Sequence, residues 1–319
     1  MKNILFIKTS SLGDVIHHMP ALTEARARLP EARFSWVVEE AYAPLVRLHP
    51  AADEVIPVAA RRWRGALHRP STWMQMAAFR RALRGRTFDG IIDTQGLLKS
   101  ALIGRYAQGR RRGYDRKSIK EPAAAWFYDI KHPIEWNQHA IARNRALTAE
   151  ALGYAAEGPP DFGLDRERLR PATGERYGVL LHATARADKE WPEANWRMLS
   201  VILGQKGIDL AVPYGNEAER ERAMRIAQAT PRARVPDRAP IDEVARLIAG
   251  ASFVVGVDTG LMHLAAALGV PLVAIFQGSE PRLTGPMGAG AIKVLGAKGA
   301  PPQVAEVVET IAELPDGGR

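Results

Sequence analysis

The sequence contains no cysteine and no long apolar segment. Without cysteine among its 319 residues, the chain can form neither disulfides nor thiolate-ligated metal sites, which fits a reducing compartment. The first apolar run covers residues 4–7 and ends at Lys8, whereas the core of a signal peptide needs about 7–15 apolar residues. No stretch approaches the roughly 18 uncharged residues of a membrane-spanning helix. We therefore expect a cytoplasmic protein that can meet a membrane only at its surface.

Sequence patterns for cofactors and metals are also missing. The loop KTSSLGD after the first apolar run holds one glycine, so it lacks both the three glycines of a dinucleotide fingerprint and the Gly-Lys-Ser/Thr of a P-loop. No two aspartates are spaced two apart, which excludes the Asp-x-Asp cation clamp of many metal-dependent sugar-nucleotide enzymes. We therefore expect no cofactor and no metal. Any departing phosphate would have to be stabilised by Lys, His and helix N-termini.

Acidic residues are scarce in one segment of the chain. Between residues 58 and 120 there are sixteen Lys and Arg against three acidic residues, a local charge of +13, although the whole chain carries only +9. Such a concentration of positive charge predicts an anionic partner, either nucleic acid, anionic lipid or a phosphorylated substrate. The alternative is a solvated arginine-rich surface. Nucleic acid is the least favoured partner, because the segment interleaves few stacking aromatics, chiefly Trp63, Trp73 and Tyr106.

Apolar runs alternate with amphipathic stretches along the chain, a pattern typical of parallel α/β sheets. We predict strands at 3–8, 33–38, 54–57, 90–93, 177–183, 208–215, 252–258 and 271–276. We predict helices at 15–29, 70–83, 98–106, 193–205, 216–229, 241–251 and 259–268.

The stretch 157–176, rich in Pro and Gly, interrupts this alternation. We predict a Rossmann-like domain over 1–160, a linker over 161–175 and a second Rossmann-like domain over 176–319, facing each other across a cleft. The final helix, about 302–314, is expected to pack either on its own domain or back on the first.

Asp14 stands where the first predicted helix begins. An aspartate in this position commonly caps the helix. The positive end of the helix also favours its ionised form, and a carboxylate that faces a cleft could accept a proton from a substrate hydroxyl. His17 and His18, on the same first turn, are alternative bases.

The segment SFVVGVDTGLMH predicts an anion site in the second half. A strand ends at Asp258, Thr259 and Gly260 open a helix, and His263 lies one turn further on. The helix N-terminus and the close backbone approach that Gly260 allows suit a diphosphate. The alternative is a capped helix with an incidental histidine. In neighbouring loops, Thr184 and Lys189 suit phosphate, and the carboxylates at 217, 219 and 221 suit either sugar hydroxyls or the helix dipole.

Six blocks of the chain together carry a family resemblance. They are KTSSLGDVIHHMPALTEA, WVVEE, IPVAARRWR, DTQGLLKSA, LHATARADKEWP and VDTGLMHLAAALG. In this order they resemble glycosyltransferase family 9, the lipopolysaccharide heptosyltransferases of GT-B fold, over nearly the whole chain. The blocks RRWR and DTQGLLKSA favour the type I enzymes, which act on a Kdo sugar, over type II enzymes with a different acceptor.

The resemblance implies an inverting, metal-independent transfer of L-glycero-D-manno-heptose from ADP-heptose to the Kdo of Kdo2-lipid A. It also implies a monomer that works at the cytoplasmic face of the inner membrane, without nucleic acid. Asp14 matches the general base of the family. The donor-binding positions match Thr184, Ala185, Lys189, Glu219, Ala239, Asp258, Thr259, Gly260 and His263, and the acceptor-binding positions match Arg61, Arg62, Arg64 and Lys120. Two residues depart from the family pattern: Ala185 replaces a second threonine, and Ala239 replaces a methionine that often lines the adenine pocket.

Overall fold

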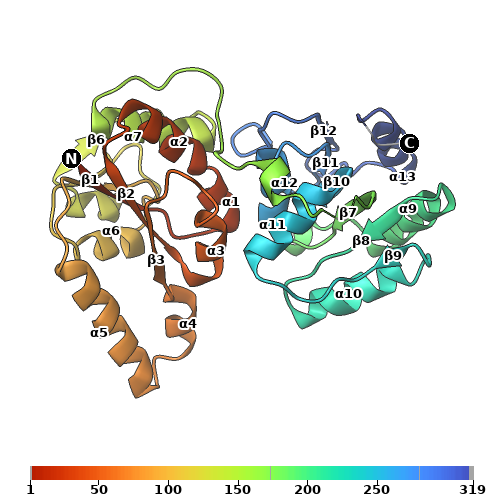
Figure 1. Ribbon diagram of the computed structural model, residues 1–319, viewed down its shortest axis with the longest axis horizontal. Coiled ribbons are helices and arrows are strands. Elements are labelled where there is room, and N and C mark those ends of the chain that lie inside the picture. The colour runs from red at the N-terminus through yellow and green to blue at the C-terminus, as the bar shows by residue number, and fades with distance from the viewer. Residues whose placement is uncertain (1, 173, 280, 316–319) are drawn as a thin grey trace. The chain divides into compact units, whose positions relative to one another are not determined.

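The protein consists of two compact α/β units. A computed structural model describes residues 2–172, 174–279 and 281–315. It divides into Met1–Gly163 and Leu164–Arg319, and each unit contains one six-stranded sheet whose pairings are all parallel (Figure 1). The predicted α/β class with two parallel-sheet domains is confirmed.

The sheet of the first unit has the order β3-β2-β1-β4-β5-β6. Its strands are β1 Asn3–Ile7, β2 Arg33–Glu39, β3 Glu54–Val58, β4 Gly90–Asp93, β5 Arg111–Tyr114 and β6 Ile130–His132. Its helices are α1 Leu12–Ile16, α2 Met19–Arg28, α3 Ala43–Val46, α4 Ala60–Gly65, α5 Pro70–Arg84, α6 Leu98–Gly104 and α7 Ala140–Leu152, with 3-10 turns η1 Glu40–Tyr42 and η2 Pro122–Phe127.

The sheet of the second unit has the order β12-β11-β10-β7-β8-β9. Its strands are β7 Tyr177–Leu181, β8 Asp209–Ala211, β9 Ala233–Arg234, β10 Phe253–Val257, β11 Leu272–Ile275 and β12 Ile292–Leu295. Its helices are α8 Arg166–Leu169, α9 Glu193–Gln205, α10 Glu217–Ala227, α11 Ile241–Gly250, α12 Gly260–Ala267 and α13 Val304–Ala312, with the 3-10 turn η3 Ala187–Lys189.

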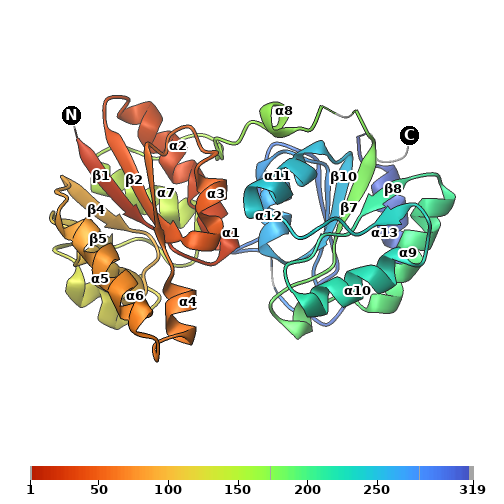
Figure 2. The ribbon, with the colours of Figure 1, turned by 60° about the horizontal axis from the view of Figure 1, so that its bottom comes forward.

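Both sheets have the same topology, although the sequence has no visible internal repeat. Counted within each unit, the strand order is 3-2-1-4-5-6, that of a Rossmann fold (Figure 2). The order reverses between β1 and β4 in the first unit and between β7 and β10 in the second. Ligands of open parallel sheets bind at the carboxyl ends of strands beside this reversal. The fold therefore singles out one edge in each unit.

Proline breaks the first predicted helix. The prediction of one helix over 15–29 is wrong, because the structure has α1 and then α2, with Pro20 in the first turn of α2. A proline inside a helix lacks the N–H for the backbone ladder and clashes with the carbonyl four residues earlier. The same proline suits a first turn. Four strands were not predicted: β5, β6, β9 and β12. Each is only two to four residues long and contains a charged residue, so it gives no long apolar run to detect.

The boundary between the units falls inside the stretch predicted as a linker. Part of that stretch forms α8, which belongs to the second unit. The guanidinium of Arg166 donates to the carbonyls of Ala249 and Ala251 at 3.0 and 2.8 Å. On the other side of the boundary, Phe162 is buried. The connection is therefore packed at both ends.

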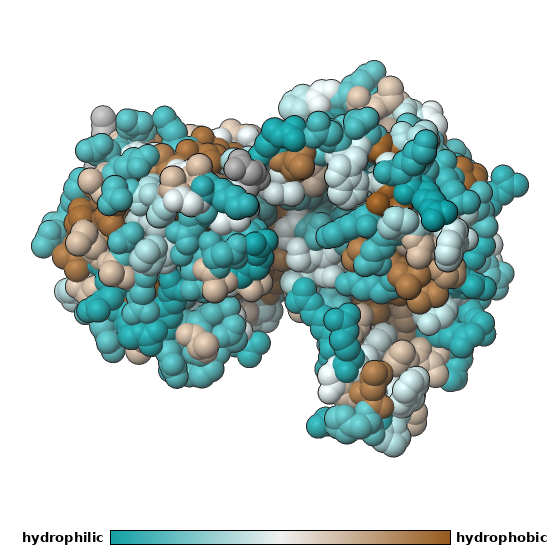
Figure 3. Space-filling model, turned by 180° about the vertical axis from the view of Figure 1, so that it is seen from behind, coloured by the Kyte–Doolittle hydropathy of each residue, from teal (hydrophilic) through white to brown (hydrophobic). Residues whose placement is uncertain are grey.

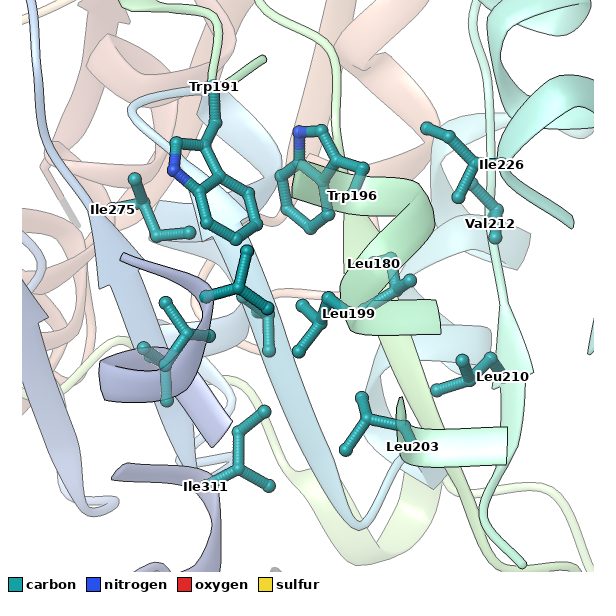
Figure 4. Close-up of a cluster of buried hydrophobic side chains, with 14 of the residues drawn as sticks. Leu180, Trp191, Trp196, Leu199, Leu203, Leu210, Val212, Ile226, Ile275 and Ile311 are labelled. Atoms are coloured by element: carbon teal, nitrogen blue, oxygen red, sulfur yellow. The ribbon is translucent and has the colours of Figure 1, made fainter. Parts of the chain in front are cut away.

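The final helix packs within the second unit. Val304, Val307 and Ile311 of α13 join a buried cluster with Trp191 and Trp196, and Figure 4 shows Ile311 in this cluster. The indole N–H of Trp191 donates to the carbonyl of Pro302 at 3.1 Å, which fixes the entry to α13. The apolar face of this helix is thus used on its own sheet.

The sheet of the first unit is covered on both faces. Leu5 and Ile7 of β1 pack with side chains from α4, α5 and α6. Phe6, between them in the chain, points the other way, where its ring meets those of Phe34 and His18. This alternation is the two-residue period of a strand that is buried on both faces.

Buried neutral histidines should make the fold sensitive to acid. Burial lowers the pKa of His49 to about 4, and its Nδ1 accepts from the backbone N–H of Ala51 at 3.2 Å. The folded pKa lies below the unfolded value, so the stabilisation is complete above about pH 6.5 and is lost as the pH falls towards 4. We expect this site to remove about 3 kcal/mol of unfolding free energy by pH 4.

His49→Asn keeps an acceptor for Ala51 but cannot titrate. We expect its unfolding midpoint, measured by circular dichroism, to fall less between pH 7 and 5 than that of the wild type. His68→Gln, at an exposed position, should follow the wild-type curve. A His49→Asn curve as steep as that of the wild type would contradict this explanation.

Candidate active site

Asp14 belongs to a capping box at the carboxyl edge of the first sheet. It is the third residue of α1, not the N-cap, and its Oδ2 accepts from the backbone N–H of Ser11 at 2.7 Å and from Ser11 Oγ at 3.0 Å. Its Oδ1 lies 3.9 Å from Lys8 Nζ, and the side chain is 40% exposed. One oxygen thus holds the helix start, and the carboxylate remains accessible to a substrate.

Lys8 is a buried cation behind Asp14. Its ammonium donates to the carbonyl of Thr94 at 2.9 Å and to Asn144 Oδ1 at 3.4 Å. Burial lowers the pKa of Lys8, and the nearby carboxylates of Asp14 and Asp93 oppose this shift. The ammonium therefore places a positive charge close to the carboxylate of Asp14.

The loop after β1 is fixed to the loop after β4. Gln95 Oε1 accepts from the backbone N–H groups of Thr9 and Ser10 at 2.9 and 3.0 Å. Gln95 is itself held by Asp93, whose Oδ1 accepts from its backbone N–H at 2.9 Å. Lys99 Nζ donates to Ser10 Oγ at 2.9 Å. These contacts join the two strands at which the sheet order reverses.

The two histidines considered as alternative bases are buried. His18 is fully buried among Phe6 and Trp36, with Nδ1 3.2 Å from Thr94 Oγ1. Burial lowers the pKa of His18 well below its ordinary value, and the charge of Lys8 adds to the effect. The ring of His17 meets that of His139, and its side chain is also buried. Neither histidine is as accessible as Asp14.

The predicted acceptor residues follow strands on either side of Asp14. Arg61, Arg62 and Arg64 lie on α4, after β3, and Lys120 follows β5; all four are exposed. Burial lowers the pKa of Lys99, with further contributions from Arg64 and Arg61, so these charges act on one another. Arg62 differs from the others, because it pairs in two-pronged fashion with Glu40 at 2.8 and 2.9 Å.

Asp258 is the centre of the contacts at the second edge. It follows β10 and is buried. Its Oδ2 accepts from Lys189 Nζ at 2.6 Å and from Ser279 Oγ at 2.5 Å, and its Oδ1 lies 3.8 Å from His263 Nε2. Its carbonyl accepts from Thr184 Oγ1 at 2.9 Å. Segments that follow three strands of the second unit, β7, β10 and β11, therefore meet at Asp258.

The helix that follows Asp258 begins at Gly260. Thr259 is the N-cap of α12, and its side chain makes no capping hydrogen bond. The N–H groups of Met262 and His263 donate to the carbonyl of Thr259 at 3.1 and 3.4 Å. The N–H groups of Gly260 and Leu261 precede the first helical acceptor, and they carry the positive end of the helix dipole. Lys189 and His263 flank this end. The arrangement suits an anion with several oxygens.

The remaining predicted donor residues lie further along the same edge. Glu219 accepts from the backbone N–H of Gly215 and from Asn216 Nδ2, both at 2.7 Å, so it caps the start of α10. Ala239 follows β9, and Ala185 follows β7; both are exposed. Since parallel strands end at one edge, the loops after β9, β8, β7, β10 and β11 form a continuous row.

Several polar residues at these two edges were not predicted from the sequence as site residues. Lys8, Gln95, Lys99, Gln277 and Ser279 all contact the predicted residues or their loops. Gln277 Nε2 donates to the carbonyls of Asp188 and Glu190, beside Lys189. Only the local signal of a polar cluster after each apolar strand could have indicated them, because the contacts join segments far apart in the sequence.

The structure shows neither a cluster of metal ligands nor a membrane-spanning helix in the part of the chain that it describes. Among residues 2–172, 174–279 and 281–315, no group of three or more His, Cys, Asp or Glu side chains is arranged to hold a metal. Over the same ranges, no helix has both the length and the apolar character to cross a membrane.

The sequence identifies the class of protein to which this site belongs. The model of glycosyltransferase family 9 (heptosyltransferase) matches residues 76–310. The chain belongs to this family, and it is therefore a glycosyltransferase, as the resemblance predicted.

Individual members of the family are similar to this chain over most of its length. The chain is 44% identical over 289 residues to lipopolysaccharide heptosyltransferase 1 of Salmonella typhimurium, covering 89% of this chain and 91% of that one. It is 46% identical to the Pseudomonas aeruginosa enzyme of the same name, covering 89% and 81%. Lipopolysaccharide heptosyltransferase 2 of Salmonella is 26% identical over 323 residues, covering 89% and 85%.

Solved structures agree with the fold. The structure of E. coli heptosyltransferase WaaC with ADP is similar to this chain with a TM-score of 0.91 and 40% identity, covering 98% of this chain and 99% of that one. This likeness confirms the predicted GT-B class.

The loop that carries Lys189 should loosen when Gly278 is replaced. A methyl group at Gly278 would overlap the carbonyl of Asp188, so Gly278→Ala must push the loop away. We expect trypsin to cleave after Arg186 and Lys189 about tenfold faster in this variant, measured by mass spectrometry of the fragments. Gly65→Ala, where a methyl group meets open space, is the matched control. Equal cleavage rates in the two variants would contradict the conclusion that close packing of Gly278 against Asp188 holds this loop in place.

Proposed function

We propose that the chain is a type I lipopolysaccharide heptosyltransferase. It would move L-glycero-D-manno-heptose from ADP-heptose to the Kdo of Kdo2-lipid A, with inversion and without a metal. The identity to type 1 relatives, 44% against 26% for a type 2 enzyme, supports the choice of acceptor. A type II acceptor is the alternative. A solved structure of WaaC with ADP-2-deoxy-2-fluoro heptose, 40% identical with a TM-score of 0.88, supports the donor.

The proposal rests on one observation: the carboxyl edges of the two sheets carry different functional groups. The first has an accessible carboxylate, Asp14, among exposed cations. The second has a helix N-terminus with Lys189 and His263. A group transfer from a diphosphate to a hydroxyl needs one base and one site for the departing charge. We propose that the two edges supply one requirement each.

In the proposed reaction, Asp14 takes the proton from the acceptor hydroxyl. The hydroxyl oxygen attacks the anomeric carbon of the heptose as the bond from that carbon to the phosphate oxygen breaks. A single displacement inverts the anomeric configuration. The departing ADP carries the negative charge, which the first N–H groups of α12, Lys189 and His263 would stabilise. Asp258 would hold Lys189 in position between turnovers through their 2.6 Å ion pair.

The nucleoside part of the donor would extend along the row of loops after β8 and β9. Glu219 and Ala239 lie there, and Thr184 and Ala185 lie beside the diphosphate end. Ala239 offers little side chain to line an adenine pocket, and Ala185 can contribute only its backbone. We infer that the ribose contacts would require Glu219 to exchange its capping bonds for sugar hydroxyls.

The acceptor would bind through its negative charges. Kdo2-lipid A carries carboxylates and phosphates, which suit the exposed Arg61, Arg64 and Lys120 near Asp14. Arg62 is engaged with Glu40 and would act mainly by fixing α4. Such an acceptor lies in a membrane, so we propose a monomer that works peripherally at the cytoplasmic face of the inner membrane.

Transfer assays with two acceptors test the proposal. We expect purified protein to transfer heptose from ADP-heptose to Kdo2-lipid A but not to an acceptor that already carries the first heptose. EDTA should leave the rate unchanged, because the leaving group is stabilised by protein cations and a helix end. Transfer only to the heptosylated acceptor would favour type II, and a strict Mg²⁺ requirement would contradict the metal-free mechanism.

Asp14→Asn tests the base. The amide oxygen can still accept from Ser11, but the side chain cannot take a proton. We expect the transfer rate to fall at least a thousandfold, whereas the ADP dissociation constant measured by calorimetry changes less than threefold. Ser11→Ala, which removes the capping hydroxyl but keeps the carboxylate, should retain most of the activity. Near-normal turnover by Asp14→Asn would exclude Asp14 as the base.

A further inference from the structure

Large apolar side chains are exposed where α4 turns into α5. Leu67, Trp73 and Met74 are 46%, 57% and 67% exposed. The indole N–H of Trp73 donates to the carbonyl of Leu67 at 2.8 Å, so these two residues form one surface. We call residues 67–74 the α4–α5 tip. Figure 1 shows it at the far end of α5 from the sheet, and Figure 3 shows hydrophobic side chains among hydrophilic ones on that projection.

Arginines surround this apolar surface. Between residues 60 and 88 the sequence has eight arginines and no acidic residue. Within the described residues, six of these arginines have no carboxylate within 4.0 Å: Arg61, Arg64, Arg69, Arg80, Arg81 and Arg84. The positive charge near the tip is therefore not neutralised inside the protein.

The length of α5 sets the spacing between these two features. At 1.5 Å per residue, Arg81 lies roughly 10 Å along the helix axis from Met74. Amphipathic elements bind at a bilayer interface by burying apolar side chains about 5–10 Å deep. With the tip at this depth, the arginines of the last turns of α5 would reach the level of the lipid phosphates. Tryptophan is also typical of this interface.

We infer that the α4–α5 tip inserts into the surface of an anionic lipid bilayer. This inference deepens the proposed function, on which it rests, by assigning the membrane contact to particular residues. Three exposed apolar side chains are too few for a stable protein interface of about 800 Å² per partner. Leucine and methionine offer no ring for stacking on bases, which disfavours nucleic acid. Exposed apolar side chains surrounded by arginines that form no ion pair suit instead the surface of a negatively charged bilayer.

Insertion at the tip would bring a lipid-borne acceptor to the site. The tip begins three residues after Arg64, on the helix that also carries Arg61. These arginines lie between the tip and the carboxyl edge of the first sheet, where Asp14 is. A headgroup that extends from the bilayer would therefore meet the predicted acceptor residues before it reaches the base.

Vesicle co-sedimentation tests the surface directly. The probe is a vesicle of phosphatidylcholine with about one-third phosphatidylglycerol, and the test variant is Met74→Ser with Arg81→Gln. The control variant, Arg197→Gln with Met198→Ser, removes one arginine and one exposed methionine from α9 of the second unit, where Met198 is 57% exposed. We expect the test variant to bind at least tenfold more weakly, and the control to bind within twofold of the wild type.

Three results would overturn the inference. In the first, the wild type does not bind these vesicles. In the second, both variants lose binding equally, so that only net charge matters. In the third, the wild type is a dimer without vesicles and the test variant is a monomer, which would make the tip a self-association surface.

Activity separates this inference from the proposed function. With a Kdo acceptor that lacks acyl chains, the test variant should transfer heptose at the wild-type rate. With Kdo2-lipid A embedded in vesicles, its KM should rise about tenfold. Failure of the wild type on both acceptors would contradict the proposed function. Equal KM values for wild type and test variant on vesicles would contradict the role of the tip alone.

Discussion

The parallel pairing of the first and fourth strands in each unit is the interaction on which the rest of the structure depends. β1 pairs with β4, and β7 with β10. The strand order reverses at these pairs, so the connections that leave them diverge and the carboxyl edge between them stays open. The loops with Asp14 and Gln95 start at one such edge, and those with Thr184 and Asp258 start at the other. The positions of the site residues thus follow from topology before any side-chain contact is considered.

The two edges differ in how their carboxylates are held. Asp258 is buried and accepts from Lys189 and Ser279, so its carboxylate is engaged in holding a cation and a hydroxyl. Asp14 is 40% exposed and keeps one oxygen away from its capping bonds. Lys8 Nζ lies 3.9 Å from Asp14 Oδ1, too far for a short ion pair. Asp14 follows the first strand of its sheet and Asp258 follows the fourth strand of its own sheet. The environment of each carboxylate therefore determines its chemistry.

The sequence predicted those features that have a local cause. The boundaries of β4 and α9 were predicted to the residue, because an apolar run or an amphipathic period ends there. Asp14 and Asp258 stood out because each follows a strand and precedes a helix. Gln95 could not be predicted, since its partners Thr9 and Ser10 are about 85 residues away. The sequence left Glu219 suited to either sugar hydroxyls or the helix dipole, and its hydrogen bonds with Gly215 and Asn216 depend on side-chain geometry that no local pattern indicates.

The scarcity of glycine in the first loop now has a physical explanation. A phosphate site at a strand–helix turn requires backbone N–H groups that point outward and have no partner. In this loop the N–H groups of Thr9 and Ser10 donate to Gln95, and that of Ser11 donates to Asp14. These three donors are therefore not available to a phosphate, and the loop holds a carboxylate that would repel one. At α12, Thr259 makes no capping hydrogen bond and the first turn contains no acidic residue. The turn after the first strand of one unit therefore disfavours a phosphate, whereas the turn after the fourth strand of the other unit suits one.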